Sequence, residues 1–171
     1  MTTYLVLSII GMAWFSAGLA LLLNKFGIPP SLSESYYNLG GKQGKGYLFY
    51  LYLAVTVFVM LAPMVEAAQY WGFLCGVGLL FVGAAPAFKR DNDDRGSLEP
   101  IIHPIGAAVC GLSSLMVLIN VTMWWWAIIT LAICGFLAWK TETVKSSYVY
   151  WIEMTAFYAL FAGMITYNST L

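Results

Sequence analysis

The chain has 171 residues, of which 61% are hydrophobic and only 9% are charged, and its formal net charge is zero. Soluble domains are roughly 45–50% apolar and about 25% charged, so this chain has too few polar residues to cover a water-exposed surface. The composition excludes a soluble enzyme, a disordered chain and a disulfide scaffold. The sequence also lacks the clustered basic residues that nucleic acid requires. We therefore expect one membrane domain over residues 1–171, surrounded by the lipid bilayer.

Six apolar runs are long enough to cross a bilayer, and they are continuous rather than alternating, which predicts helices. The predicted spans are Tyr4–Leu23, Tyr47–Met64, Tyr70–Phe88, a run from Ile101 or Pro104 to Ile119, Met123–Trp139 and Tyr148–Ile165. Pro63, Glu66 and Gln69 predict a tight hairpin between the second and third spans. The first run resembles a signal peptide in length, but no basic residue precedes it, so we expect a retained helix. The predicted fold class is an all-α, polytopic membrane helix bundle with six transmembrane helices.

The basic residues fall in alternate connections between the predicted spans. They are Lys25, Lys42, Lys45, Lys89, Arg90, Arg95, Lys140 and Lys145. The positive-inside rule makes these connections cytoplasmic, and an even number of spans then places both termini outside. We expect an integral protein of a bacterial inner membrane.

Small residues predict close helix packing between the third and fourth spans. Gly72 and Gly76 are four residues apart on one span. On the other span the same spacing separates Ala107 from Gly111 and Gly106 from Cys110. Small residues at this spacing allow the backbones of membrane helices to approach closely. A groove that faces a ligand, or a surface that joins copies of the chain in a homo-oligomer, would use the same residues.

A polar segment separates the first two spans: Pro29-Pro30-Ser31-Leu32-Ser33-Glu34-Ser35-Tyr36-Tyr37. The two prolines favour an extended backbone, after which Ser31 or Ser33 is suited to cap a short helix. Ser33 and Glu34 are candidate catalytic residues, and Tyr36 and Tyr37 are candidate ligand-binding residues. A capped helix at the membrane interface is the purely structural alternative.

Three ionisable residues are the remaining candidates. Glu99 and His103 are four residues apart, so on a helix they would share one face, with Glu99 binding ligand and His103 acting as a proton shuttle or base. Glu153 lies inside the sixth span, where a carboxylate must be paired, protonated or facing a wet cavity. A salt bridge to Lys140 or Lys145 would be its structural role. One histidine is too few for a catalytic zinc site, and we expect no metal and no cofactor.

The Ser31–Tyr37 segment and the run His103-Pro104-Ile105-Gly106-Ala107-Ala108 together resemble the superfamily of alkaline ceramidases and progestin/adipoQ receptors. The resemblance implies a hydrolase-like pocket on the cytoplasmic side and carries over Ser33, Glu34 and His103. The family has seven spans and a zinc site with three histidines. This chain has six predicted spans and one histidine, which implies that the metal has been lost.

With the predicted orientation, the Ser33–Tyr37 segment, the Glu99–His103 pair and Glu153 all lie at the cytoplasmic side, which predicts one cytosol-facing polar pocket. Transport or channelling of a small solute or ion, with Glu153 as a proton or cation site, is the first functional expectation. The second is a membrane-embedded hydrolase of a lipid-like substrate, with His103 as base and a serine or an activated water as nucleophile. A noncatalytic membrane partner is the third.

Overall fold

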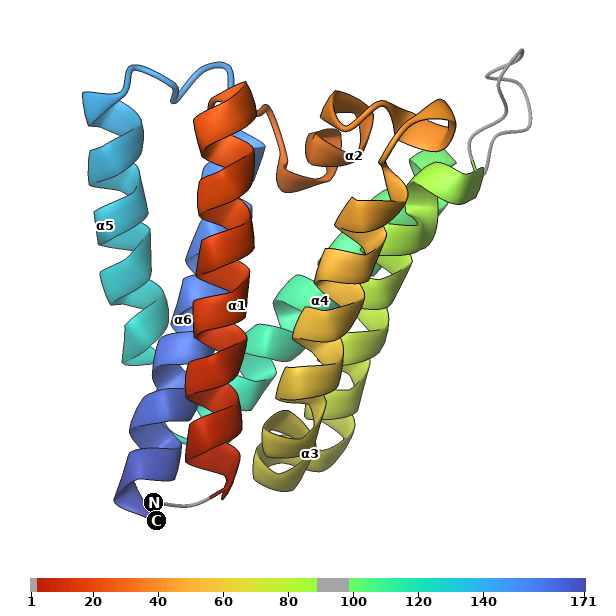
Figure 1. Cartoon of the computed structure of the whole chain (residues 1–171). Coiled ribbons are helices and arrows are strands. Elements are labelled where there is room, and N and C mark those ends of the chain that lie inside the picture. Colours follow the sequence, from red (N-terminus) through yellow and green to blue (C-terminus); the bar gives the residue numbers. More distant parts are fainter. Residues whose placement is uncertain (1–2, 89–98) are drawn as a thin grey trace.

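The computed structural model describes residues 3–88 and 99–171, and within these ranges the chain is helical without a strand. The elements are α1 (Thr3–Phe26), η1 (Leu32–Glu34), α2 (Ser35–Asn38), η2 (Gly41–Gln43), α3 (Tyr47–Ala84), η3 (Ala85–Phe88), α4 (Glu99–Asn120), α5 (Trp125–Lys140) and α6 (Tyr148–Thr170). The start of α1 and the end of α6 lie together at one end of the bundle, and α2 and the α5–α6 connection lie at the other (Figure 1). The predicted all-α helix bundle is confirmed.

The 38-residue element α3 is a helical hairpin. Its backbone leaves the helical region at Ala68 (φ −147°, ψ 23°) and Gln69 (φ 39°, ψ −107°). The chain then returns along itself, so that a Cβ on Gly72 would collide with the backbone of Met64. The break lies where Pro63, Glu66 and Gln69 predict it, although Pro63 itself remains helical.

One predicted span is shorter than the helices that are long enough to cross a membrane. By length and composition, α1, α3, the Ile101–Asn120 part of α4, and α6 are apolar helices long enough to cross a membrane. The fifth predicted span, Met123–Trp139, corresponds to the 16-residue α5, which is shorter than the others. The turn after α4 takes up Val121 to Trp124, with Thr122 at a φ of 59°, so α5 begins two residues later than predicted.

An aromatic cluster holds α1, α3 and α6 together. The ring of Phe15 stacks on Tyr52 at 5.6 Å between centroids and approaches Phe157 at 4.5 Å and Phe161 at 5.4 Å. The Tyr52 hydroxyl donates to the backbone oxygen of Phe15 at 2.6 Å, which satisfies a polar group that burial would otherwise penalise. Phe157 and Phe161 belong to α6, so their contacts with Phe15 pack α6 against α1.

The third and fourth predicted spans are in close contact, as expected, and on the fourth span through the predicted pair Gly106 and Cys110. On the third span the contact is at Gly78 rather than at Gly72 and Gly76. A Cβ on Gly78 would lie 2.6 Å from the Cys110 nitrogen and 2.8 Å from the Gly106 oxygen, so the backbones of α3 and α4 meet there. Gly72 and Gly76 instead face the first half of α3. The sequence could not separate these glycines because they lie on neighbouring faces of one helix.

The segment from Gly27 to Ser35 crosses the bundle end between α1 and α2. Gly27 ends α1 with a φ of 74°, and its N–H donates to the Leu23 oxygen at 2.9 Å. The segment is then tied to the start of α6, since the Tyr150 N–H donates to the Pro30 oxygen at 3.1 Å. Ser31 precedes η1 without making a side-chain cap, in contrast to the cap that the sequence predicts there.

Candidate functional site

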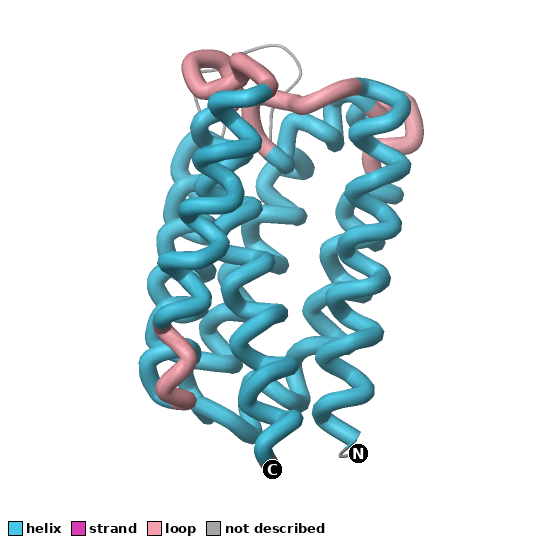
Figure 2. The backbone as a smooth tube through the Cα atoms, turned by 90° about the vertical axis from the view of Figure 1, so that its left-hand side faces the viewer, coloured by secondary structure: helices cyan, strands magenta, loops and turns pink. Residues whose placement is uncertain are grey.

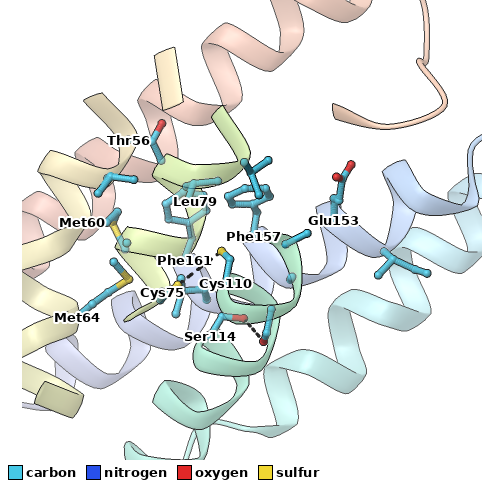
Figure 3. Close-up of a pocket in the computed structure, with 18 of the residues that line it drawn as sticks. Thr56, Met60, Met64, Cys75, Leu79, Cys110, Ser114, Glu153, Phe157 and Phe161 are labelled. Carbon is cyan, nitrogen blue, oxygen red and sulfur yellow. Dashed lines mark hydrogen bonds between the residues drawn. The ribbon is translucent and has the colours of Figure 1, made fainter. Parts of the chain in front are cut away.

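A cavity of about 370 Å³ lies between both halves of α3, α4 and α6 (Figure 3). Its walls are mostly aliphatic, aromatic and sulfur-containing side chains. They include Met60, Met64, Cys75, Leu79, Cys110, Phe157 and Phe161. The interior therefore favours an apolar guest.

Two ionisable side chains, His103 from α4 and Glu153 from α6, line the same cavity. Both belong to the half of the bundle near the α5–α6 connection, since His103 lies near the start of α4 and Glu153 near the start of α6. Deeper in the cavity, the hydroxyls of Thr56 and Ser114 donate to carbonyl oxygens of their own helices, at 2.9 Å and 2.8 Å. The cavity thus has one ionisable end and an otherwise apolar body.

Ser33 lies at the ionisable end. Its Oγ is 3.3 Å from His103 Nε2 and 2.9 Å from Ser31 Oγ. Ser33 is buried, while the His103 side chain is half-buried. A buried hydroxyl that contacts an imidazole is the arrangement that a nucleophile and its general base require.

Glu153 is bound to the same segment through the backbone. Its Oε2 accepts a hydrogen bond of 2.7 Å from the Leu32 N–H. A charged acceptor makes such a bond shorter and stronger than a neutral one. From the sequence, the expected partner was Lys140, Lys145 or another basic residue of the cytoplasmic connections, because a backbone amide leaves no signal in the sequence.

The other candidate residues lie apart from this cluster. Tyr36 is buried and its ring packs edge-on against Tyr37 at 5.2 Å, and Tyr36 lines a separate hollow near η2. Glu34 is half-buried in η1. Glu99 begins α4, but its side chain lies outside the described part of the structure. The structure therefore brings together Ser33, His103 and Glu153 from the sequence-predicted set.

The zinc site of the ceramidase and progestin/adipoQ receptor superfamily does not fit these residues. Within residues 3–88 and 99–171, no group of three or more His, Cys, Asp or Glu side chains is placed to hold a metal ion. His103 is the only histidine of the chain.

Sequence reasoning missed the sulfur-rich wall of the cavity. Cys75 and Cys110 lie with their Sγ atoms 3.9 Å apart, one from each of two contacting helices. Their sequence signal was limited to the small residues around them, Gly76 and Gly111, which also line the cavity.

No family model, curated protein or solved structure matches this chain.

Proposed function

We propose that this protein is a six-span integral protein of a bacterial inner membrane, with both termini outside. Large apolar side chains on the outer helix faces support this placement, since Leu21, Phe58 and Leu112 are 73%, 72% and 67% exposed. The connections that carry Lys25, Lys42, Lys45, Lys140 and Lys145 lie at the end of the bundle opposite both termini (Figure 2). The positive-inside rule makes that end cytoplasmic.

In this proposal α5 crosses the bilayer as a short span. Sixteen helical residues extend about 24 Å, a few ångströms less than the hydrocarbon layer of ~30 Å. Trp124 and Trp125 at its start and Trp139 at its end are suited to the two interfaces. Local thinning of the bilayer accommodates such a mismatch at modest cost.

The function we propose is hydrolysis of a lipid-like substrate at the cytoplasmic side. The single observation that carries it is the Ser33–His103 contact at the ionisable end of an apolar cavity. The hydrocarbon part of the substrate lies among α3, α4 and α6, and its scissile acyl bond lies at Ser33. The resemblance to alkaline ceramidases favours the same class through Ser33 and His103.

The proposed chemistry follows from the two side chains. His103 Nε2 accepts the proton of Ser33 while Oγ attacks the acyl carbon, and the protonated imidazole then passes that proton to the leaving oxygen or nitrogen. Water, with its proton taken by His103, then attacks the acyl carbon of the acyl-serine. The bond to Ser33 Oγ breaks, His103 returns the proton to Oγ, and the acid is released. Glu153 acts as a positioning residue, because it contacts the Leu32 amide that precedes Ser33.

The test is hydrolysis of acyl-labelled lipids by the purified protein in liposomes, followed as release of free fatty acid. We expect activity that Ser33→Ala and His103→Ala each reduce by at least about a hundredfold, the usual contribution of general base catalysis. The control is Ser146→Ala, an exposed serine of the α5–α6 connection at the same end of the bundle, which should leave the rate unchanged. Equal activity of the wild-type protein and both variants would contradict the proposal.

Transport is the second candidate, and Glu153 is the observation that favours it. An acidic side chain on the cavity wall of a membrane helix is typical of a proton or cation site. A pH-dependent flux of protons or cations into the same liposomes would favour transport over hydrolysis, provided that Glu153→Gln abolishes the flux and no lipid is hydrolysed. The apolar body of the cavity makes hydrolysis the first choice.

A further inference from the structure

Two of the chain's three cysteines meet in the wall of the cavity. The Sγ atoms of Cys75, in the second half of α3, and Cys110, in α4, are 3.9 Å apart (Figure 3). Both thiols are free, and both side chains line the cavity. Cys110 follows His103 by about two turns of α4, and the proposed hydrolysis uses neither thiol. Because 35 residues separate the two cysteines, no sequence motif marks the pair.

Thioether sulfurs belong to the same part of the cavity wall. Met60 and Met64 line the cavity, and both are buried. A Cβ on Gly76 would lie 3.1 Å from Leu61 Cδ1. The turn of α3 that carries Cys75 therefore packs against the turn that carries Met60. Three rotatable bonds allow a methionine sulfur to adjust its position toward a neighbouring group.

We propose that Cys75 and Cys110 bind one Cu(I) ion, with a methionine of the same wall as an additional ligand. Soft thiolate and thioether sulfurs favour Cu(I), whereas carboxylate, carbonyl and water oxygens suit magnesium, calcium and manganese. A metal–thiolate bond is about 2.3 Å long in the case of zinc. An ion bound at such a length between sulfurs 3.9 Å apart is held in a bent arrangement, which leaves one side open to a third ligand.

The surroundings of the pair favour Cu(I) over zinc. Structural zinc sites take four ligands, usually cysteine and histidine. Within residues 3–88 and 99–171, no third His, Cys, Asp or Glu joins the two thiols in a group that could hold a metal ion. Residues 89–98 contain no cysteine, methionine or histidine, so they add no soft ligand.

The charge of the complex also favours a monovalent ion. A Cu(I) ion that displaces the proton of one thiol leaves the two sulfurs and the metal with no net charge, and the proton passes to the solvent. An uncompensated charge in this apolar wall would be costly. The copper is taken up as Cu(I), so binding requires no oxidant or reductant.

The test is transfer of copper to the purified full-length protein in detergent without oxygen. Cu(I) is supplied as its coloured complex with bicinchoninate, and loss of the colour measures binding. We expect one Cu(I) per chain, with the affinity lowered at least about a hundredfold by Cys75→Ser and by Cys110→Ser, since even residues that only support a metal ligand contribute about 10–100-fold. The matched control is Cys134→Ser, a buried cysteine that does not line the cavity, which should leave the affinity unchanged.

X-ray absorption of the copper-loaded wild-type protein provides a measurement that does not depend on the folding of the variants. We expect the edge of Cu(I) and only sulfur neighbours around the ion. Ser33→Ala should bind copper as the wild type does, so failure of the proposed hydrolysis would leave this site unaffected. No transfer of Cu(I) from bicinchoninate, equal losses in all three cysteine variants, or nitrogen and oxygen neighbours around the ion would each overturn the proposal.

Discussion

The carboxylate of Glu153 binds the backbone amide of Leu32, at 2.7 Å and across 121 residues of sequence. This bond attaches the segment before α2 to the wall of the cavity, one residue away from Ser33. A second bond, from the Tyr150 amide to the Pro30 oxygen at 3.1 Å, attaches the same segment one turn earlier on α6. Together these two bonds to α6 position Ser33 next to His103.

Removing the Glu153 side chain should release this segment. Glu153→Ala leaves the Leu32 amide without its acceptor, which costs about 1–3 kcal/mol for a buried donor. Glu153→Gln retains an oxygen acceptor and should lose less. Hydrogen exchange of residues 28–35 in detergent measures the effect, and we expect faster exchange in the alanine variant. Glu142→Gln, at an exposed position of the α5–α6 connection, is the control and should leave this exchange unchanged.

Ser33 and His103 should act as one unit. If the hydroxyl needs the imidazole, the double variant Ser33→Ala/His103→Ala should hydrolyse lipid about as slowly as either single variant, because residues that act together are not additive. The rates of the four proteins under single-turnover conditions form the double-mutant cycle. Multiplicative losses in the double variant would show that the two side chains act independently.

The contact between α3 and α4 predicts a strong difference between two glycines. Gly78→Ala places a Cβ against the Cys110 nitrogen and the Gly106 oxygen, both backbone atoms, and overpacking of this kind costs about 1–3 kcal/mol. Gly135→Ala on α5 meets no atom within 4 Å, and it should be neutral or stabilise by about 0.5–1 kcal/mol through helix propensity. Thermal unfolding in detergent compares the two variants. The same loss of stability in both would contradict the packing described here.

The thiols of Cys75 and Cys110 should form a disulfide on oxidation. Their Sγ atoms are 3.9 Å apart, so we expect a disulfide to form when a membrane-permeant oxidant such as diamide is added. Counting free thiols by mass after alkylation in denaturant should show two fewer per chain. Cys110→Ser should prevent the loss, whereas Cys134→Ser, which removes the remaining cysteine, should not. If all three thiols of the wild-type protein remain free after oxidation, Cys75 and Cys110 lie further apart than described here.

Much of the fold could be predicted because membrane helices are recognisable in a sequence by their length and apolar composition. The long runs gave α1, α4 and α6, and the polar residues around Gln69 gave the hairpin in α3. The first residue of α5 could not be predicted, because the tryptophans there are compatible both with a helix and with a turn at the membrane interface. Helix ends set by backbone dihedrals, such as that of Thr122, have no clear composition.

The candidate site was only partly readable. Ser33, His103 and Glu153 were conspicuous because ionisable and hydroxyl groups are costly in an apolar sequence. The Leu32 amide that binds Glu153 had no signal, since every residue but proline carries the same donor. Tyr36 belonged to a different hollow from the one expected, because η1 and α2 turn its ring toward the glycine-rich loop.

Photolabelling tests most directly whether a lipid-like molecule occupies the cavity beside Ser33, His103 and Glu153. A phospholipid that carries a diazirine at the end of one acyl chain is incorporated with the protein into liposomes, irradiated, and its adducts are mapped by peptide mass spectrometry. We predict adducts on Met60, Met64, Leu79 and Phe161, which line the body of the cavity. Adducts confined to outward-facing residues of α5, such as Ile128 and Leu131, would contradict the account.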